Sequence, residues 1–508
     1  MQAASVHLDT RRVIADIDRR LFGSFVEHLG RAVYNGIYEP NHPLANEHGF
    51  RADVLELVRE LGVSTVRYPG GNFVSSYRWE DGVGPQESRP QRIDLAWHSL
   101  ETNEVGLDEF ARWAHAAGTE LMLAVNLGTR SIEAAVDLLE YANVRGGTEL
   151  SDARITNGEI HPHDVRMWCL GNEMDGPWQV GYTDADSYGR LAAQTARAMR
   201  RVDGTLELVL CGSSKPDMPT FGEWERRALR HAYDVVDYIS CHAYYEELDG
   251  DRASFLASGV SMDRFIEAVA ATADQVQAEL KHDRVMKISF DEWNVWYNRR
   301  FHREDKITDP HTWPHAPRLL EDQYTVVDAV VVGGLLISLL NHADRVRAAS
   351  LAQLVNVIAP IMTEPGGPAW RQTIFYPFAD ASRLSKGVVL DLLVEAPTYF
   401  TERYGEVPVI DAAATWDEAS GSVSVFLVNR TQDAVAIAVD LTAVSDARLV
   451  GASSIWSNDQ DAANSLHSPD TVTPRPNDSA SIGDGQLTVT LPAVSWTAVQ
   501  IKVRSAHP

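Results

Sequence analysis

The chain has little cysteine, with only Cys169, Cys211 and Cys241 among its 508 residues. No two of them form a Cys-x-x-Cys pair, and each lies within an apolar run typical of a strand. A disulfide framework or a cysteine-based metal site therefore has little support. We expect three buried, reduced thiols that pack as small apolar side chains.

Positive charge is also scarce, because 45 Lys and Arg residues stand against 71 Asp and Glu residues and the formal net charge is -26. Such a chain repels nucleic acid and anionic lipid surfaces, whereas neutral partners such as sugars are not excluded. The longest apolar run, 329–340, is too short to span a bilayer. The opening residues, MQAASVHLDTRR, lack the basic and apolar segments of a secretory signal. We expect a cytoplasmic protein that binds neither nucleic acid nor membranes.

The composition, 44% apolar and 23% charged, is that of a globular protein, and the length predicts one large and one smaller domain. From about residue 22 to residue 356, short β-rich runs alternate with longer helical patterns, which indicates a parallel sheet. Eight strands favour a (β/α)8 TIM barrel. A doubly wound open sheet is the alternative, although no GxGxxG motif follows the first strand. The predicted strands are 22–27, 64–70, 120–126, 165–172, 206–212, 238–243, 285–291 and 347–354, with helical spacing in 53–61, 107–117, 185–201 and 323–340.

After about Ser385 the pattern changes to the period-two alternation of a β-sandwich. The stretch 457–485 is rich in Asn, Asp, Ser and Pro, so we predict a long surface loop there. Residues 5–18 also alternate and are not followed by a helix, so they are predicted to add a strand to the sandwich. The expected units are an N-terminal strand in 1–18, a barrel in 19–384 and a sandwich in 385–508. The alternating runs are 422–428, 434–441, 486–491 and 496–503.

Polar residues end most of the predicted barrel strands, where the loops that follow the strands face one shared pocket. This clustering suits a polyhydroxylated ligand, because each sugar hydroxyl stripped of water needs a new hydrogen-bond partner. The strand-end residues are Glu27, Arg67, Asn72, Asn126, Asn172, Glu173, His242, Tyr244, Glu292 and Gln353.

Two of these residues, Glu173 and Glu292, form a candidate catalytic pair at the ends of the fourth and seventh strands. Retaining glycoside hydrolysis needs one carboxylic acid to protonate the leaving oxygen and one carboxylate to attack the anomeric carbon, roughly 5–5.5 Å apart. In FDEW, strict alternation places Glu292 on the same face as Phe290 and Asp291 on the other. Asp291 is therefore the weaker candidate.

Several other residues allow two interpretations. Arg67 is either a structural partner of a carboxylate or the group that keeps Glu292 ionised. His242 is by default a buried histidine with satisfied hydrogen bonds. Because no HExxH motif occurs, we expect neither a metal nor a cofactor, and we predict that His161, His163, His311 and His315 are loop residues. Each of Trp79, Trp97, Trp178, Trp293 and Trp296 could lie in the core or stack on a sugar, and we favour Trp97 and Trp296 for the pocket.

Taken together, the motifs resemble one known family. They are GSFVEHLGRAVYNGIYEP, VRYPGGNFVSSYRWEDGVGP, WCLGNEMDGPWQVG and FDEWNVWY, followed by LLEDQYTVVDA and LAQLVN. In order and position they closely resemble the intracellular α-L-arabinofuranosidases of glycoside hydrolase family 51, along nearly the whole chain. The resemblance implies a (β/α)8 barrel with a jelly-roll-like sandwich and, commonly, a homohexamer. It also implies a retaining, exo-acting enzyme that releases terminal non-reducing α-L-arabinofuranosyl groups from arabinan, arabinoxylan and derived oligosaccharides.

The resemblance also implies a role for each motif residue. Glu173 in GNE is expected to be the acid/base and Glu292 in DEW the nucleophile. Linkage preference stays open, because the loop 298–317 can differ among family members. Another retaining barrel glycosidase, such as a β-xylanase, β-glucanase or β-glycosidase, remains the alternative. The expected ligands of the arabinose hydroxyls are Glu27, Asn72, Asn172 and Gln353, with Tyr244 donating to the nucleophile, Arg67 and His242 supporting the site, and Trp97 and Trp296 lining it.

Overall fold

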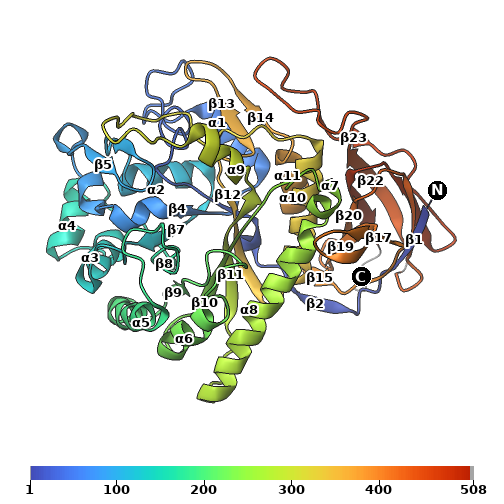
Figure 1. Ribbon diagram of the computed structural model, residues 1–508, viewed down its shortest axis with the longest axis horizontal. Coiled ribbons are helices and arrows are strands. Elements are labelled where there is room, and N and C mark those ends of the chain that lie inside the picture. The colour runs from blue at the N-terminus through green and yellow to red at the C-terminus, as the bar shows by residue number, and fades with distance from the viewer. Residues whose placement is uncertain (1, 445, 504–508) are drawn as a thin grey trace.

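The computed structural model describes residues 2–444 and 446–503, and its larger part is a closed barrel of parallel strands (Figure 1). Around the barrel the strands follow their order in the chain, and the last pairs with the first. Closure confirms the predicted barrel and excludes the open sheet. The strands are β3 (Gly23–Phe25), β4 (Thr65–Tyr68), β7 (Glu120–Val125), β8 (Met167–Leu170), β9 (Glu207–Leu210), β10 (Tyr238–Tyr245), β11 (Lys287–Val295) and β12 (Val346–Ala352).

Helices cover the outside of the barrel. The first two long ones, α1 (Ala52–Leu61) and α2 (Leu107–Ala117), both end at a glycine with φ 78°, a left-handed conformation that favours glycine. The other helices are α3 (Ile132–Asn143), α4 (Glu149–Thr156), α5 (Ala185–Val202), α6 (Glu223–Ala232), α7 (Arg252–Leu256), α8 (Ser258–Leu280), α9 (Asn298–Arg300), α10 (Val326–Asn341) and α11 (Phe375–Leu384). Short helical turns are η1 (Arg19–Phe22), η2 (Asn72–Ser76), η3 (Trp79–Gly82), η4 (Gln86–Ser88) and η5 (Phe301–Asp305).

The C-terminal part forms the predicted β-sandwich of two sheets. In spatial order, one sheet contains β2 (Val13–Asp16), β15 (Val388–Leu390), β19 (Ile410–Asp417), β20 (Ser422–Asn429), β26 (Ser495–Lys502), β22 (Arg448–Ile455) and β23 (Arg475–Pro476). The other contains β16 (Leu393–Glu395), β1 (Gln2–His7), β21 (Val435–Asp440), β25 (Gln486–Leu491) and β24 (Ser481–Gly483). The N-terminal residues thus supply one strand to each sheet. Three hairpins complete the fold: β5 (Arg92–Asp94) with β6 (Ser99–Glu101), β13 (Ile361–Thr363) with β14 (Ala369–Arg371), and β17 (Thr398–Thr401) with β18 (Gly405–Pro408).

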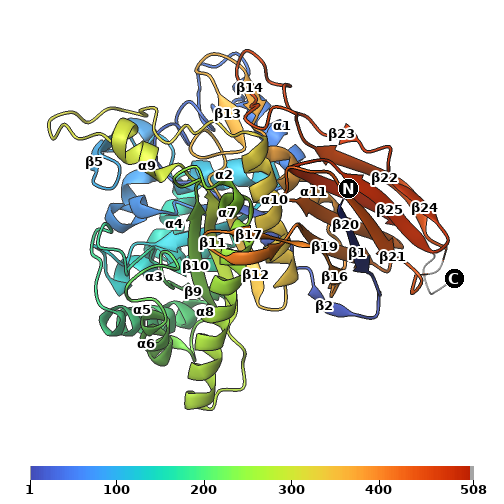
Figure 2. The same ribbon diagram turned by 45° about the vertical axis from the view of Figure 1, so that its right-hand side comes forward.

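The helix α10 joins the barrel to the sandwich (Figure 2). It contacts α8 and β11 on one side and β19, β20 and β26 on the other, so its apolar surface is buried all round. A Cβ atom on Gly333 would lie 2.4 Å from the ring of Trp496, so only glycine lets the sandwich approach this closely. Among residues 2–444 and 446–503, no helix is both long and apolar enough to cross a membrane.

The stretch 457–485 is not the continuous surface loop that its composition predicts. It contains the short strands β23 and β24, and one of its segments packs against the barrel. Asn464 is buried there, where its side-chain amide donates to the backbone oxygens of Arg371 and Val472. A polar residue can be buried when its hydrogen bonds are satisfied, which composition alone does not reveal.

Candidate functional site

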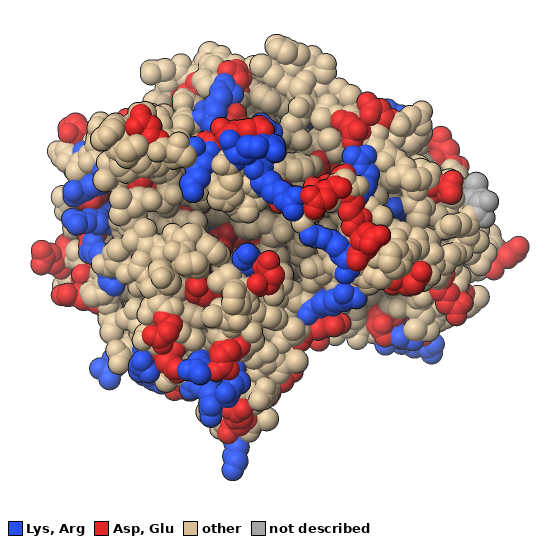
Figure 3. All heavy atoms as spheres, viewed as in Figure 1, with Lys and Arg blue, Asp and Glu red and all other residues tan. Residues whose placement is uncertain are grey.

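A pocket of about 770 Å³ opens at the carboxyl ends of the barrel strands. The face that carries α9 is hollowed near its middle and has charged side chains of both signs around the hollow (Figure 3). Arg67, Asn172 and His242 are buried just beneath the pocket and reach its lining through hydrogen bonds. Eight of the predicted site residues line the pocket: Glu27, Asn72, Trp97, Glu173, Tyr244, Glu292, Trp296 and Gln353.

Glu292 is buried on β11 between two hydrogen-bond donors. Its Oε1 atom accepts from Nη1 of Arg67 at 3.0 Å, and its Oε2 atom accepts from the hydroxyl of Tyr244 at 2.7 Å. Burial and the charge of Glu292 raise the pKa of Tyr244 well above its ordinary value, so the phenol keeps its proton. A cation and a hydroxyl donor thus stabilise Glu292 as an anion.

Glu173 follows β8 and has a backbone conformation that is unusual for residues other than glycine. Its φ is 44°, in the left-handed region, which costs roughly 1–3 kcal/mol and is often found at functional sites. Its Oε2 atom accepts from Nε1 of Trp178 at 2.7 Å, and its Oε1 atom lies 3.0 Å from Nδ1 of His242. Its contacts therefore differ from those of Glu292, since no arginine within residues 2–444 and 446–503 bonds to it.

The two glutamates face each other across His242. One oxygen of each carboxylate and one nitrogen of His242 lie within 4.8 Å of one another. Burial lowers the pKa of His242, but the charge of Glu292 and the hydrogen bond to Glu173 outweigh burial and raise it overall. This spacing would also admit a metal ion, but Arg67 beside Glu292 opposes a second cation. Protein groups alone account for the cluster.

Glu27 ties together three segments at the other side of the pocket. Its Oε1 atom accepts from the backbone N of Phe73 at 2.8 Å and from Nε1 of Trp97 at 2.7 Å. Its Oε2 atom accepts from Nε2 of Gln353 at 3.2 Å. Burial raises the pKa of Glu27 well above its ordinary value. Through these hydrogen bonds, Glu27 fixes the positions of the Trp97 indole and the Gln353 amide, which also line the pocket.

Asp291 does not point away from the site as strict alternation predicts. The pairing of β10 with β11 shifts register between Ser240 and His242, so β11 contains an extra residue at this level. Phe290 packs outward against Phe265 of α8, whereas Asp291 and Glu292 both face the barrel interior. The expected shared face of Phe290 and Glu292 is therefore wrong, and the irregularity in the strand is the reason.

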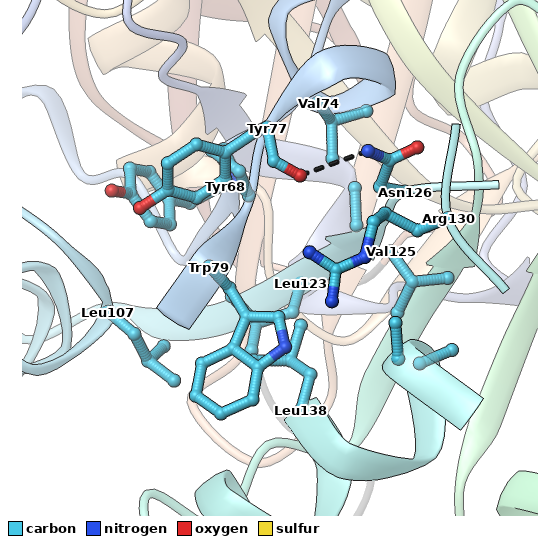
Figure 4. A pocket seen from close by; sticks show the side chains of 14 residues that line it. Tyr68, Val74, Tyr77, Trp79, Leu107, Leu123, Val125, Asn126, Arg130 and Leu138 are labelled. Atoms are coloured by element: carbon cyan, nitrogen blue, oxygen red, sulfur yellow. Dashed lines mark hydrogen bonds between the residues drawn. The ribbon is translucent and has the colours of Figure 1, made fainter. Parts of the chain in front are cut away.

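Asn126 directly follows β7 but does not line the pocket. Its side-chain amide donates to the backbone oxygen of Tyr77 and to the hydroxyl of Thr129, beside a separate cavity of about 30 Å³ (Figure 4). Trp79 lines that cavity, and Trp293 is fully buried. Within the described residues, the pocket lining includes none of His161, His163, His311 and His315.

Sequence reasoning missed two groups that shape the site. Trp178 was weighed only as a general candidate, yet its indole N–H donates to Glu173. Asp94 accepts from the backbone N of Ala96 and of Trp97, and so holds the turn that presents Trp97 to Glu27. Burial raises the pKa of Asp94 to about 7. A short polar side chain before a turn is a recognisable signal for such an anchor.

Comparison with known proteins gives consistent matches in both halves of the chain. The family "Alpha-L-arabinofuranosidase 1 domain" matches residues 57–256, and "Alpha-L-arabinofuranosidase C-terminal domain" matches residues 291–495. The intracellular exo-α-(1→5)-L-arabinofuranosidase of Streptomyces lividans is 55% identical over 98% of this chain and 75% of its own length. The exo-α-(1→6)-L-arabinofuranosidase of Bifidobacterium longum is 54% identical over 99% of this chain and 98% of its own length.

A solved structure agrees with these sequence matches. The family 51 α-L-arabinofuranosidase from Bifidobacterium longum superposes with a TM-score of 0.94 at 50% identity, covering 98% of this chain and 99% of that chain. The similarity extends through the barrel and the sandwich alike, which confirms the family suggested by the motifs. The chain therefore belongs to glycoside hydrolase family 51 and is an exo-acting α-L-arabinofuranosidase, a glycosidase that releases terminal arabinofuranosyl residues.

Proposed function

We propose that the enzyme works with retention of configuration, with Glu292 as nucleophile and Glu173 as acid and base. The observation that carries this proposal is the placement of the two carboxylates, which have oxygens within 4.8 Å of each other and different partners. Retaining glycosidases hold their carboxyl groups about 5–5.5 Å apart, whereas inverting ones leave about 6.5–9.5 Å for a water molecule. The short separation favours direct attack by a carboxylate.

The contacts of each glutamate suit its proposed role. Arg67 and Tyr244 favour the charged form of Glu292, which is the form that attacks the anomeric carbon. Among the described residues, Glu173 contacts His242 and Trp178 and no arginine, and from this position it can give its proton to the leaving oxygen. After the leaving group departs, the same carboxylate takes a proton from water, which then attacks the covalent intermediate.

The proposed substrates are arabinan, arabinoxylan and their oligosaccharides, with the terminal arabinofuranosyl group held by Glu27, Asn72, Asn172 and Gln353. Arg67, His242, Trp97 and Trp296 complete the proposed site. The relatives named above act on (1→5) and (1→6) linkages, so a product profile on linear arabinan, branched arabinan and arabinoxylan oligosaccharides will decide linkage preference. We further propose that the enzyme is intracellular and that it forms a homohexamer. Light scattering can check the homohexamer through its molar mass in solution.

Azide rescue tests the division of labour between the glutamates. Glu173→Ala should impair substrates with poor leaving groups most, because an activated aryl group departs without protonation. Added azide should restore turnover of the aryl substrate by Glu173→Ala. The product should be an arabinosyl azide of retained configuration, since azide needs no general base. Glu292→Ala should block the intermediate for all substrates, and any rescue should give the inverted azide.

Two results would contradict this mechanism. One is the same pair of signatures with the residues exchanged, and the other is inversion by the wild-type enzyme, seen by NMR of the first-formed sugar. A panel of aryl glycosides checks the sugar itself. Faster cleavage of the β-xyloside or β-glucoside than of the α-L-arabinofuranoside would favour another retaining barrel glycosidase.

A further inference from the structure

Asp291 is a buried carboxylate that the two-carboxylate mechanism leaves without a role. It is 2% exposed and faces the barrel interior. Its Oδ2 atom lies 3.8 Å from Nε of Arg67 and 3.6 Å from Sγ of Cys169, and its Oδ1 atom accepts from the hydroxyl of Ser289. A charge buried this deeply needs a partner of opposite sign. Burial raises the pKa of Asp291 above its ordinary value, and the charge of Arg67 is the largest influence that opposes this rise, so Arg67 is the main partner that favours the charged form.

Arg67 serves two carboxylates at once. Its Nη1 atom donates to Glu292 and its Nη2 atom donates to Asn172 at 2.6 Å. Its Nε atom donates to Sγ of Cys169 at 3.4 Å and lies 3.8 Å from Oδ2 of Asp291. Burial alone would lower the pKa of Arg67, but Cys169, Asp291 and Glu292 around the guanidinium raise it well above its ordinary value. The guanidinium therefore stays charged. Of the two anions that balance it, only Glu292 reacts.

We propose that Asp291 is a positioning residue that remains as the counter-ion of Arg67 while Glu292 carries the sugar. This inference rests on the proposed function. As an oxygen of Glu292 bonds to the anomeric carbon, the bond to the leaving oxygen breaks and the proton of Glu173 passes to that oxygen. Glu292 then becomes a neutral ester, and the negative charge beside Nη1 disappears. Asp291 is chemically unchanged by this step, so the buried guanidinium keeps a partner.

The same arrangement affects how readily Glu292 attacks. A cation paired with two anions stabilises each anion less than a cation paired with one. If Asp291 were neutral, Arg67 would stabilise anionic Glu292 more strongly in the resting enzyme and would lack a counter-ion in the intermediate. Both effects oppose formation of the intermediate. Its breakdown, which restores the Glu292 anion beside Arg67, is not opposed.

The other titratable groups near this set limit what a pH profile can report. Burial raises the pKa of Cys211 to about 12, and raises those of Cys169, Cys241 and Tyr244 well above their ordinary values, so these groups stay protonated at acidic pH. The acidic limb of activity therefore does not report these thiols or this phenol. The charged and titratable groups that face Asp291, Arg67 and Glu292 are Glu27, Cys169, Glu173, Cys211, Cys241, His242 and Tyr244.

The test compares Asp291→Asn with the wild type and with Cys169→Ala, a neutral change at a side chain that contacts both Arg67 and Asp291. With an activated aryl α-L-arabinofuranoside, the pre-steady-state burst measures formation of the intermediate and single-turnover decay measures its breakdown. We expect Asp291→Asn to slow formation about tenfold and to move the acidic limb of kcat/KM about one pH unit lower. Breakdown should change little. Cys169→Ala should alter neither the ratio of the two steps nor the acidic limb.

Equal slowing of both steps with an unmoved acidic limb would leave Asp291 a structural role only and overturn the inference. If Asp291→Asn does not fold, Ser289→Ala replaces it, because losing the donated hydroxyl raises the pKa of Asp291 and weakens its charge. The ratio of the steps should then shift in the same direction by less, and an unchanged ratio would refute the inference. A 2-fluoro arabinofuranoside that traps the wild-type intermediate tests the proposed function separately. A label on a residue other than Glu292 would overturn that function whatever Asp291→Asn shows.

Discussion

The isosteric change Glu27→Gln tests the pocket through one well-defined conflict between hydrogen-bond donors. In the wild type, Oε2 of Glu27 accepts from Nε2 of Gln353, while Oε1 of Gln353 accepts from the backbone N of Glu27, each at 3.2 Å. The Oε1 atom of Glu27 is already fixed by the donors of Phe73 and Trp97. An amide at position 27 therefore places its NH2 group against the NH2 group of Gln353. Rotating the amide of Gln353 only moves the clash to the backbone N.

The size of the effect follows from this one unsatisfied contact. A buried polar group left without a partner costs about 1–3 kcal/mol, and each 1.4 kcal/mol is tenfold in rate or binding. Because Glu27 and Gln353 both line the pocket, the cost is borne where the arabinosyl group is expected to bind. We expect kcat/KM for an aryl α-L-arabinofuranoside to fall roughly ten- to a hundredfold. The melting temperature should fall as well, since the conflict exists without substrate.

A paired exchange provides the matched control. In the double variant Glu27→Gln, Gln353→Glu, the amide at position 27 donates to one carboxylate oxygen at position 353, and the other oxygen accepts from the backbone N. All hydrogen bonds are then satisfied, so most of the lost melting temperature and part of the lost kcat/KM should return. Wild-type kcat/KM in Glu27→Gln alone would refute the reasoning, and so would a double variant less stable than the single one.

Three further predictions follow from the same structure. Asn172→Ala removes the acceptor of Nη2 of Arg67 and should lower kcat/KM roughly ten- to a hundredfold, and near wild-type kinetics would count against the pocket assignment. We propose that barrel and sandwich fold as one unit. A chain truncated after Ser385 should therefore be insoluble, because the apolar surface of α10 that Trp496 covers would be exposed. A soluble, active truncated enzyme would contradict this. Burial raises the pKa of Asp94 from 3.8 to about 7, so between these pH values the folded chain keeps a proton that the unfolded chain has released. The free energy of unfolding should therefore fall as pH rises from about 4 to about 7. In Asp94→Asn the melting temperature should fall less over this pH range than in the wild type. The same dependence of melting temperature on pH in both proteins would contradict the raised pKa of Asp94.

Much of the fold was predictable because it depends on local periodicity. The eight barrel strands were predicted from short β-rich runs and the main helices from helical spacing between these runs, and the change to period two after Ser385 marked the sandwich. Polar residues at strand ends then identified Glu173 and Glu292, since parallel strands in a barrel bring their carboxyl ends to one face. Asn126 shows the limit of that rule, because its amide bonds within its own turn instead of entering the pocket.

The sequence by itself determined the barrel, the sandwich, the family and the pair of facing glutamates. The tertiary structure alone decided that Asp291 turns inward beside Arg67, that Trp178 donates to Glu173, and that α10 is buried from both sides. These features depend on a register shift in one strand pair, on a left-handed residue after another strand, and on contacts between segments far apart in the chain. Periodicity reports which face of a single element is apolar. It does not report which residue of another element lies opposite, and that pairing sets the charges and hydrogen bonds of the site.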